Sequence, residues 1–294
     1  MKNTFRTFAA LSPPAARWVR KVGVHPRYWY QSAAAQLGYY LYQDRYPDRA
    51  VFIAGLPKSG TTWMKKMLAS FPGFHEILIP QAAAYELENG GSHDYSLPED
   101  LFQRLEQKLV VTKMHIPGSE HNVDVLHRNN QKYLIMYRDL RDVALSYYHY
   151  VRRTPWHPEH PSYQDLSLRE GLKEFAETLL VPYAEWVWSW ENNRDSELSM
   201  MVSYENLLKN PEGILRQAAD HFTIAVNRET IMQVVEQHSF EMMSGGRPRG
   251  DEEITSFFRK GVVGGWREHF TEDLRKLYLL KTGDFTEYFD FPTE

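Results

Sequence analysis

The chain has 294 residues, of which 43% are hydrophobic and 24% are charged, the composition of an ordinary soluble globular protein. Its formal net charge of −4 argues against a nucleic-acid binder that neutralises phosphates over a broad face. Cysteine is absent, which excludes disulfides, thiolate nucleophiles and cysteine-ligated metal or iron–sulfur sites.

Charge is distributed unevenly along the chain. Residues 1–43 contain six Lys or Arg and no Asp or Glu, which leaves −10 for residues 44–294. We therefore expect a basic N-terminal arm or helices over 1–43, folded or lying on the surface, and one folded domain over 44–294. No run approaches the roughly 18–20 apolar residues of a membrane-spanning helix, so no transmembrane segment is expected.

Short apolar runs alternate with helical patterns from residue 50 onwards. We predict strands at 50–54, 109–113, 133–137 and 198–203, and helices at 61–71, 119–129, 139–153 and 211–222. Each strand is a short, mainly apolar run, which is typical of parallel strands buried on both faces. The alternation predicts an α/β fold, a single parallel sheet with helices on both faces. The glycine-rich stretch 243–265 is expected to be a mobile loop.

A glycine-rich turn connects the first predicted strand to its helix, with the sequence Gly55-Leu56-Pro57-Lys58-Ser59-Gly60-Thr61-Thr62-Trp63. Such a turn points backbone N–H groups and the positive end of the helix dipole at one spot, which favours phosphate. The spacing from Gly55 to Gly60 matches the nucleotide-triphosphate loop G-x-x-x-x-G-K-[ST], but here the Lys lies inside the loop, as Lys58. We expect Lys58 near a bridging oxygen and not beside a terminal γ-phosphate.

Three ordered motifs resemble those of the cytosolic-type sulfotransferases. The stretch 57–63 resembles the family's loop for the 5′-phosphosulfate end of 3′-phosphoadenosine 5′-phosphosulfate (PAPS), and 133–148 resembles its 3′-phosphate segment. Arg259-Lys260-Gly261, followed by Gly264, Trp266, Phe270 and Thr271, resembles the C-terminal element R-K-G-x-x-G-D-W-K-x-x-F-T. The resemblance implies a P-loop-type fold, PAPS as co-substrate, a small-molecule acceptor and a cytoplasmic enzyme that requires no metal.

Lys113 and His115 stand two positions apart at the end of a predicted strand, so both side chains are expected on one face. Imidazole suits a general base at neutral pH. The resemblance makes His115 the catalytic base, with Lys58 on the leaving oxygen and Lys113 on the sulfuryl oxygens. The cofactor-binding residues that it implies are Lys58, Ser59, Gly60, Thr61, Thr62, Trp63, Arg138, Ser146, Tyr204, Phe240, Arg259, Lys260 and Gly261, with Trp63, Tyr204 and Phe240 at the adenine.

An alternative reading is a P-loop kinase or NTPase in which Asp139 imitates a magnesium ligand. The displaced Lys58 and the pair of Arg138 and Ser146 oppose it. Two positions depart from the family pattern, Gly265 in place of Asp and Arg267 in place of Lys, and the short dimerisation element of many vertebrate members has lost most of its pattern. We therefore infer no oligomeric state.

The motifs do not identify the acceptor molecule. A hydroxyl, an amine nitrogen or a carbamoyl nitrogen would serve as the nucleophile. Aromatic residues at 147–163 would suit a phenol, whereas the acidic domain would suit a polar cationic alkaloid of the saxitoxin kind.

Overall fold

The computed structural model describes residues 12–90, 94–283, 285–289 and 291. Its centre is a five-stranded, wholly parallel sheet with the order β2-β3-β1-β4-β5. The strands are β1 (Ala50–Gly55), β2 (His75–Glu76), β3 (Val110–Met114), β4 (Tyr133–Tyr137) and β5 (Ser199–Ser203). The α/β prediction and the four predicted strands are thereby confirmed within a residue. The two-residue strand β2 was missed because it is polar and has no apolar run.

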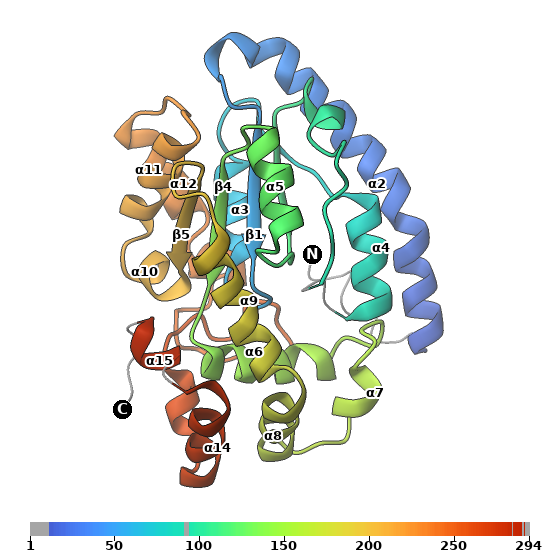
Figure 1. Ribbon diagram of the computed structural model, residues 1–294, viewed down its shortest axis with the longest axis vertical. Helices are drawn as coiled ribbons and strands as arrows, with labels where there is room; N and C mark the ends of the chain where they lie inside the picture. Colours follow the sequence, from blue (N-terminus) through green and yellow to red (C-terminus); the bar gives the residue numbers. More distant parts are fainter. Residues whose placement is uncertain (1–11, 91–93, 284, 290, 292–294) are drawn as a thin grey trace.

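Helices cover both faces of this sheet (Figure 1). The four predicted helices are α3 (Thr61–Leu68), α5 (Glu120–Arg128), α6 (Leu140–Arg152) and α11 (Pro211–His221). The others are α2 (Pro13–Tyr42), α4 (Pro80–Asn89), α7 (His160–Tyr163), α8 (Leu168–Thr178), α9 (Leu180–Asn193), α10 (Tyr204–Lys209), α12 (Arg228–Gln237), α13 (Phe240–Ser244), α14 (Glu272–Thr282) and α15 (Phe285–Tyr288). Short 3₁₀ turns occupy Gln43–Arg45, Gln103–Leu105 and Gly265–Glu268.

Alternate residues of the central strands face two separate cores. Phe52 of β1 and Ile135 of β4 pack into the core covered by α5, α6, α8 and α9. Ile53 of β1 and Leu134 of β4 pack into the core covered by α3, α11 and α12. Because both faces are covered, β1 is buried along its whole length. This leaves the carboxyl ends of the strands as the open edge for polar groups.

The described part of the basic arm is one long helix, α2, which runs beside α4 along the edge of the domain (Figure 1). Its buried side chains include Ala16, Val24 and Ala35. The carbonyl of Ala35 accepts a hydrogen bond from the Leu109 amide at 3.1 Å, and Gln31 Oε1 accepts one from the Leu78 amide at 2.9 Å. Within the described ranges no helix has the length and apolarity to cross a lipid bilayer.

Two glycines of α2 provide a matched test of this packing. A Cβ on Gly38 would lie 2.0 Å from the carbonyl oxygen of Gly73, whereas a Cβ on Gly23 would meet nothing within 4 Å. Gly38→Ala therefore pushes α2 off the domain and should lower the free energy of unfolding by about 1–3 kcal/mol. Gly23→Ala should raise it by about 0.5–1 kcal/mol, because alanine favours a helix interior. Urea unfolding of the two variants measures both; equal effects would contradict the close contact.

Candidate active site

The loop between β1 and α3 is fixed to the neighbouring strand β4. The hydroxyl of Ser59 donates to the carbonyls of Leu56 at 2.7 Å and Met136 at 3.1 Å, and the Leu56 amide also donates to Met136. Ser59 is fully buried, so its hydroxyl holds the loop in shape. Lys58 adopts φ 68°, which turns its side chain out of the strand direction at the centre of the loop.

Gly60 ends this loop and begins α3. It has φ 82°, and a Cβ there would lie 2.6 Å from the ring of Tyr204, so both its conformation and its contact require glycine. Thr61 and Thr62 are the first residues of α3, where backbone N–H groups point out of the helix end. Trp63 follows, and its ring packs edge-to-face with that of Tyr204, with 6.4 Å between the centroids. The predicted loop residues are thus assembled around one helix N-terminus.

Lys113 and His115 lie together beside this loop, as predicted. Both are half-buried and they flank the buried Met114. Nδ1 of His115 contacts the carbonyl oxygen of Gly55, and Nε2 lies 3.2 Å from Nζ of Lys113. A carbonyl accepts only, so Nδ1 carries the proton and Nε2 presents its lone pair. Nε2 is therefore the nitrogen of His115 that can take a proton from a ligand.

Burial and neighbouring cations lower the pKa values of His115, Lys113 and Lys58. Burial, followed by the charge of Lys113, lowers the pKa of His115 to about 4, so the imidazole is neutral at neutral pH. Burial also lowers the pKa of Lys113 to about 8, against the opposing charge of Glu86. The pKa of Lys58 falls well below its ordinary value because of burial and, after it, the charges of Arg153, Lys113, Arg138 and Arg259. Such a concentration of positive charge favours an anionic ligand.

Arg138 follows β4 and connects three parts of the site. Its guanidinium donates to the carbonyl of Val262 at 2.9 Å and to that of Lys58 at 3.4 Å, and lies 4.2 Å from the Tyr204 ring centre. Its Nε is buried without a hydrogen-bond partner among the described residues. It also forms a buried ion pair with Asp142 at 3.5 Å.

Asp142 attaches the C-terminal loop, residues 245–271 between α13 and α14, to α6. Its carboxylate accepts hydrogen bonds from the amides of Gly264 at 2.7 Å and Trp266 at 3.1 Å. A carboxylate on α6 therefore holds this loop on both sides of Gly265. The family pattern has an Asp at that position, whereas Gly265 has no side chain. Ser146 is half-buried one turn further along α6, on the same face as Asp142.

The C-terminal loop brings the predicted basic residues to this region, each with an acidic partner. Arg259 forms an ion pair with Glu252, and Lys260 forms one with Glu268 at 2.9 Å. Gly261 has φ 67° and lies against the ring of Phe240, which a Cβ on Gly261 would meet at 2.3 Å. Phe240 and Gly261 thus make one contact surface.

Two residues near the reacting groups, Arg153 and Phe257, were not expected from the sequence, and Tyr150 was expected only as part of an acceptor pocket at 147–163. Nζ of Lys58 lies 4.1 Å from the ring centre of Tyr150 and 5.2 Å from that of Phe257. Arg153 donates to the carbonyl of Ile254 at 2.8 Å and so attaches α6 to the same loop. The helical pattern predicted the helix that carries Tyr150 and Arg153, but gave no sign that their side chains turn toward the phosphate loop.

Glu205 is a further buried acid in this region. It accepts a hydrogen bond from the Asp139 amide at 3.2 Å, and burial raises its pKa to about 7 against the opposing charge of Arg138. In the part of the chain that the structure describes, no group of three or more His, Asp or Glu is arranged to hold a metal ion.

Comparison with known proteins gives one family over most of the chain. The model of the sulfotransferase domain matches residues 48–278. Sulfotransferase 6B1 of Danio rerio is 26% identical over 230 residues, which cover 76% of this chain and 73% of the relative. The flavonol 3-sulfotransferase of Flaveria bidentis is 25% identical over 257 residues, which cover 76% of this chain and 77% of the relative.

Solved structures share the fold. Mouse sulfotransferase SULT7A1 complexed with PAP has a TM-score of 0.60 at 21% identity, covering 88% of this chain and 95% of that one. Retinol dehydratase in a complex with retinol and PAP has a TM-score of 0.57 at 22% identity, and the match covers 85% of this chain and 86% of that one.

The attachment of the C-terminal loop can be tested at Asp142. Asp142→Ala removes the acceptor of two amides and leaves Arg138 without its ion-pair partner. It should lower the free energy of unfolding by about 3 kcal/mol and expose the loop to trypsin. Asp142→Asn retains an acceptor oxygen and should have a smaller effect. Limited proteolysis with thermal unfolding measures both, and Asp124→Ala, at an exposed position, is the control. An unchanged cleavage rate in Asp142→Ala would contradict this attachment.

Proposed function

The chain belongs to the sulfotransferase family, and on this premise we propose that it transfers a sulfuryl group from PAPS to a small-molecule acceptor and releases adenosine 3′,5′-bisphosphate (PAP). The observation that carries the proposal is the Lys113–His115 pair, 3.2 Å apart, beside a phosphate-type loop with Lys58 at its centre. The two solved relatives that contain PAP support the choice of co-substrate.

The cofactor would extend from the phosphate loop toward the C-terminal loop. Loop amides with Thr61 and Thr62 would hold the 5′-phosphate at the N-terminus of α3. Arg138 and Ser146 would bind the 3′-phosphate, and the unpartnered buried Nε of Arg138 supports this role. The remaining 3′-phosphate ligands are Arg259, Lys260 and Gly261, and the adenine would lie among Trp63, Tyr204 and Phe240.

In the proposed reaction, Nε2 of His115 takes the acceptor proton as the acceptor atom attacks sulfur in line. The bond from sulfur to the 5′-phosphate oxygen breaks, and its electron pair remains on that oxygen, where Lys58 neutralises the charge. Lys113 stabilises the sulfuryl oxygens. A bound phosphosulfate adds negative charge beside the imidazole and raises the pKa of His115 from about 4, which strengthens the base.

The kinase or NTPase alternative is disfavoured by Asp139. Its carboxylate is buried and bound to Arg141 at 2.6 Å, and it also caps α6 by accepting from the Arg141 amide. The Asp139 carboxylate therefore has a structural role and does not serve as a magnesium ligand. Turnover with PAPS in the presence of a chelator, and none with ATP, would separate the two activities.

For the acceptor we propose a polar cationic molecule, such as a guanidinium alkaloid of the saxitoxin kind, with a hydroxyl, amine or carbamoyl nucleophile. Glu86 of α4 supports this, because its negative charge acts on Lys113, His115 and Tyr150 at the reacting end of the site. Of the aromatic residues that would suit a phenol, Tyr150 lies in the site beside Lys58, but others are buried elsewhere. Tyr147 and Tyr163 pack in the core beneath α6.

His115→Ala should lower kcat by roughly 10²–10⁴-fold, because the acceptor proton loses its base. The Kd for PAP should stay nearly unchanged, because PAP lacks the sulfuryl group that His115 faces. Turnover is measured by mass spectrometry of the sulfated acceptor, and PAP binding by calorimetry. His127→Ala, on the exposed face of α5, is the matched control. Near-native turnover in His115→Ala would remove the base assignment.

Glu86→Gln should lower kcat/KM for cationic acceptors more than for neutral phenols, because it removes a negative charge that acts on Lys113 and His115. Glu88→Gln is the control, since Glu88 lies on the same helix in an exposed ion pair with Lys21. A panel of guanidinium alkaloids, amines and phenols assayed with PAPS measures the difference. Equal loss for both classes would mean that Glu86 acts on the catalytic pair and not on the acceptor.

A further inference from the structure

The outward side of α2 carries half of the exposed large apolar side chains found among the described residues. Together they form what we call the α2 outer face. Their exposed fractions range from 38% to 78%. The members are Trp18, Val19, Val22, Trp29, Tyr30, Leu37, Tyr40 and Leu41. Exposed apolar patches of this size mark interaction sites more often than isolated surface residues do.

Helical geometry places these side chains in one continuous arc. At about 100° per residue, Trp18, Val22, Trp29 and Tyr40 fall within about 40° of one another. The other four lie next to them, at roughly 100–140° on the same scale. The residues that bury against the domain, among them Val24 and Ala35, lie beyond this arc. The outer face is therefore a stripe along the helix and not a scatter of single residues.

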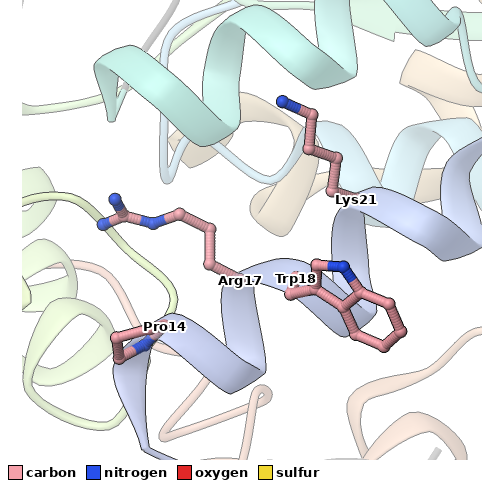
Figure 2. A pocket seen from close by; sticks show the side chains of 4 residues that line it. All are labelled: Pro14, Arg17, Trp18 and Lys21. Atoms are coloured by element: carbon pink, nitrogen blue, oxygen red, sulfur yellow. The ribbon is translucent and has the colours of Figure 1, made fainter.

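Cations border the stripe on both sides. On the same scale Lys21 lies about 60° beyond one edge of the arc, and Arg27 and Arg20 lie about 40–60° beyond the other, while α2 contains no Asp or Glu. Arg17 falls at the angle of the buried Ala35, and the guanidinium of Arg20 lies 5.1 Å from the ring centre of Trp156. Figure 2 shows Arg17 and Lys21 leaving the helix on one side and the ring of Trp18 on another, around a surface recess of about 330 Å³. Lys21 also lies 3.4 Å from Glu88 of α4.

We propose that the α2 outer face binds an anionic lipid surface, with α2 lying in the plane of the interface. An apolar arc rich in Trp and Tyr and flanked by Arg and Lys is the chemistry that inserts at the headgroup level. The charge distribution favours a membrane contact through α2 alone, because residues 44–294 carry −10 and are repelled by such a surface.

A second copy of the chain fits this face less well. A parallel contact between two α2 helices would bring the cations of residues 17–27 against the same cations of the other copy. Those like charges have no acid within α2 to offset them. The lipid surface offers the opposite charge along the whole length of the helix.

The test is co-sedimentation of the full chain with vesicles of phosphatidylcholine, with and without phosphatidylserine. We expect binding to the anionic vesicles, roughly tenfold weaker binding to the neutral ones, and release at high salt because the charges are exposed. The double variant Trp18→Ser/Trp29→Ser should lose vesicle binding and keep its turnover. Leu279→Ser/Leu280→Ser removes two exposed apolar side chains from α14 and should bind as the unaltered chain does.

Three outcomes would overturn the proposal. One is an unaltered chain that stays in the supernatant with anionic vesicles, and another is vesicle binding that the tryptophan substitutions leave unchanged. The third is a dimer, seen by light scattering, that Trp18→Ser/Trp29→Ser converts to a monomer while no vesicle binding occurs. Circular dichroism of the double variant verifies that α2 remains helical, so that lost binding reports the missing side chains.

Discussion

The Asp142 carboxylate joins three segments that are far apart in the chain. It lies on α6, pairs with Arg138 at the end of β4, and holds the amides of Gly264 and Trp266 in the C-terminal loop. This carboxylate therefore helps to hold the cations of that loop in the same region as the phosphate loop, together with the hydrogen bonds from Arg138 to Val262 and from Arg153 to Ile254. An array of like charges is unfavourable without a ligand, so the site depends on neutral and acidic groups that keep it assembled.

The sequence was sufficient for the parts of the fold that repeat a simple pattern. Buried parallel strands are mainly apolar, so β1, β3, β4 and β5 were predictable, as was the glycine-rich turn that follows β1. The two-residue spacing of Lys113 and His115 correctly placed them on one face. The resemblance then supplied the partners at Arg138 and in the C-terminal loop, whose proximity no local pattern indicates.

Other features depend on tertiary contacts. The long helix α2 contains Gly23 and Pro26, which interrupt a helical pattern, and it is stabilised by packing on α4 and β2. Glu252 and Glu268 partner the two basic residues of the C-terminal loop, but nothing in their spacing predicts those pairs. Glu86 stands 27 residues before Lys113, and its charge acts on Lys113 only through the tertiary placement of α4.

The position of α2 also has a consequence for association between chains. An edge strand of a sheet exposes amides and carbonyls that another chain can pair with. Beyond β2, which forms one edge of this sheet, the Leu78 amide is taken by the side-chain oxygen of Gln31 on α2. A side-chain amide thus occupies a place that a foreign strand would otherwise fill. That edge is closed to strand-by-strand growth, and a chain that lost α2 would expose it to aggregation.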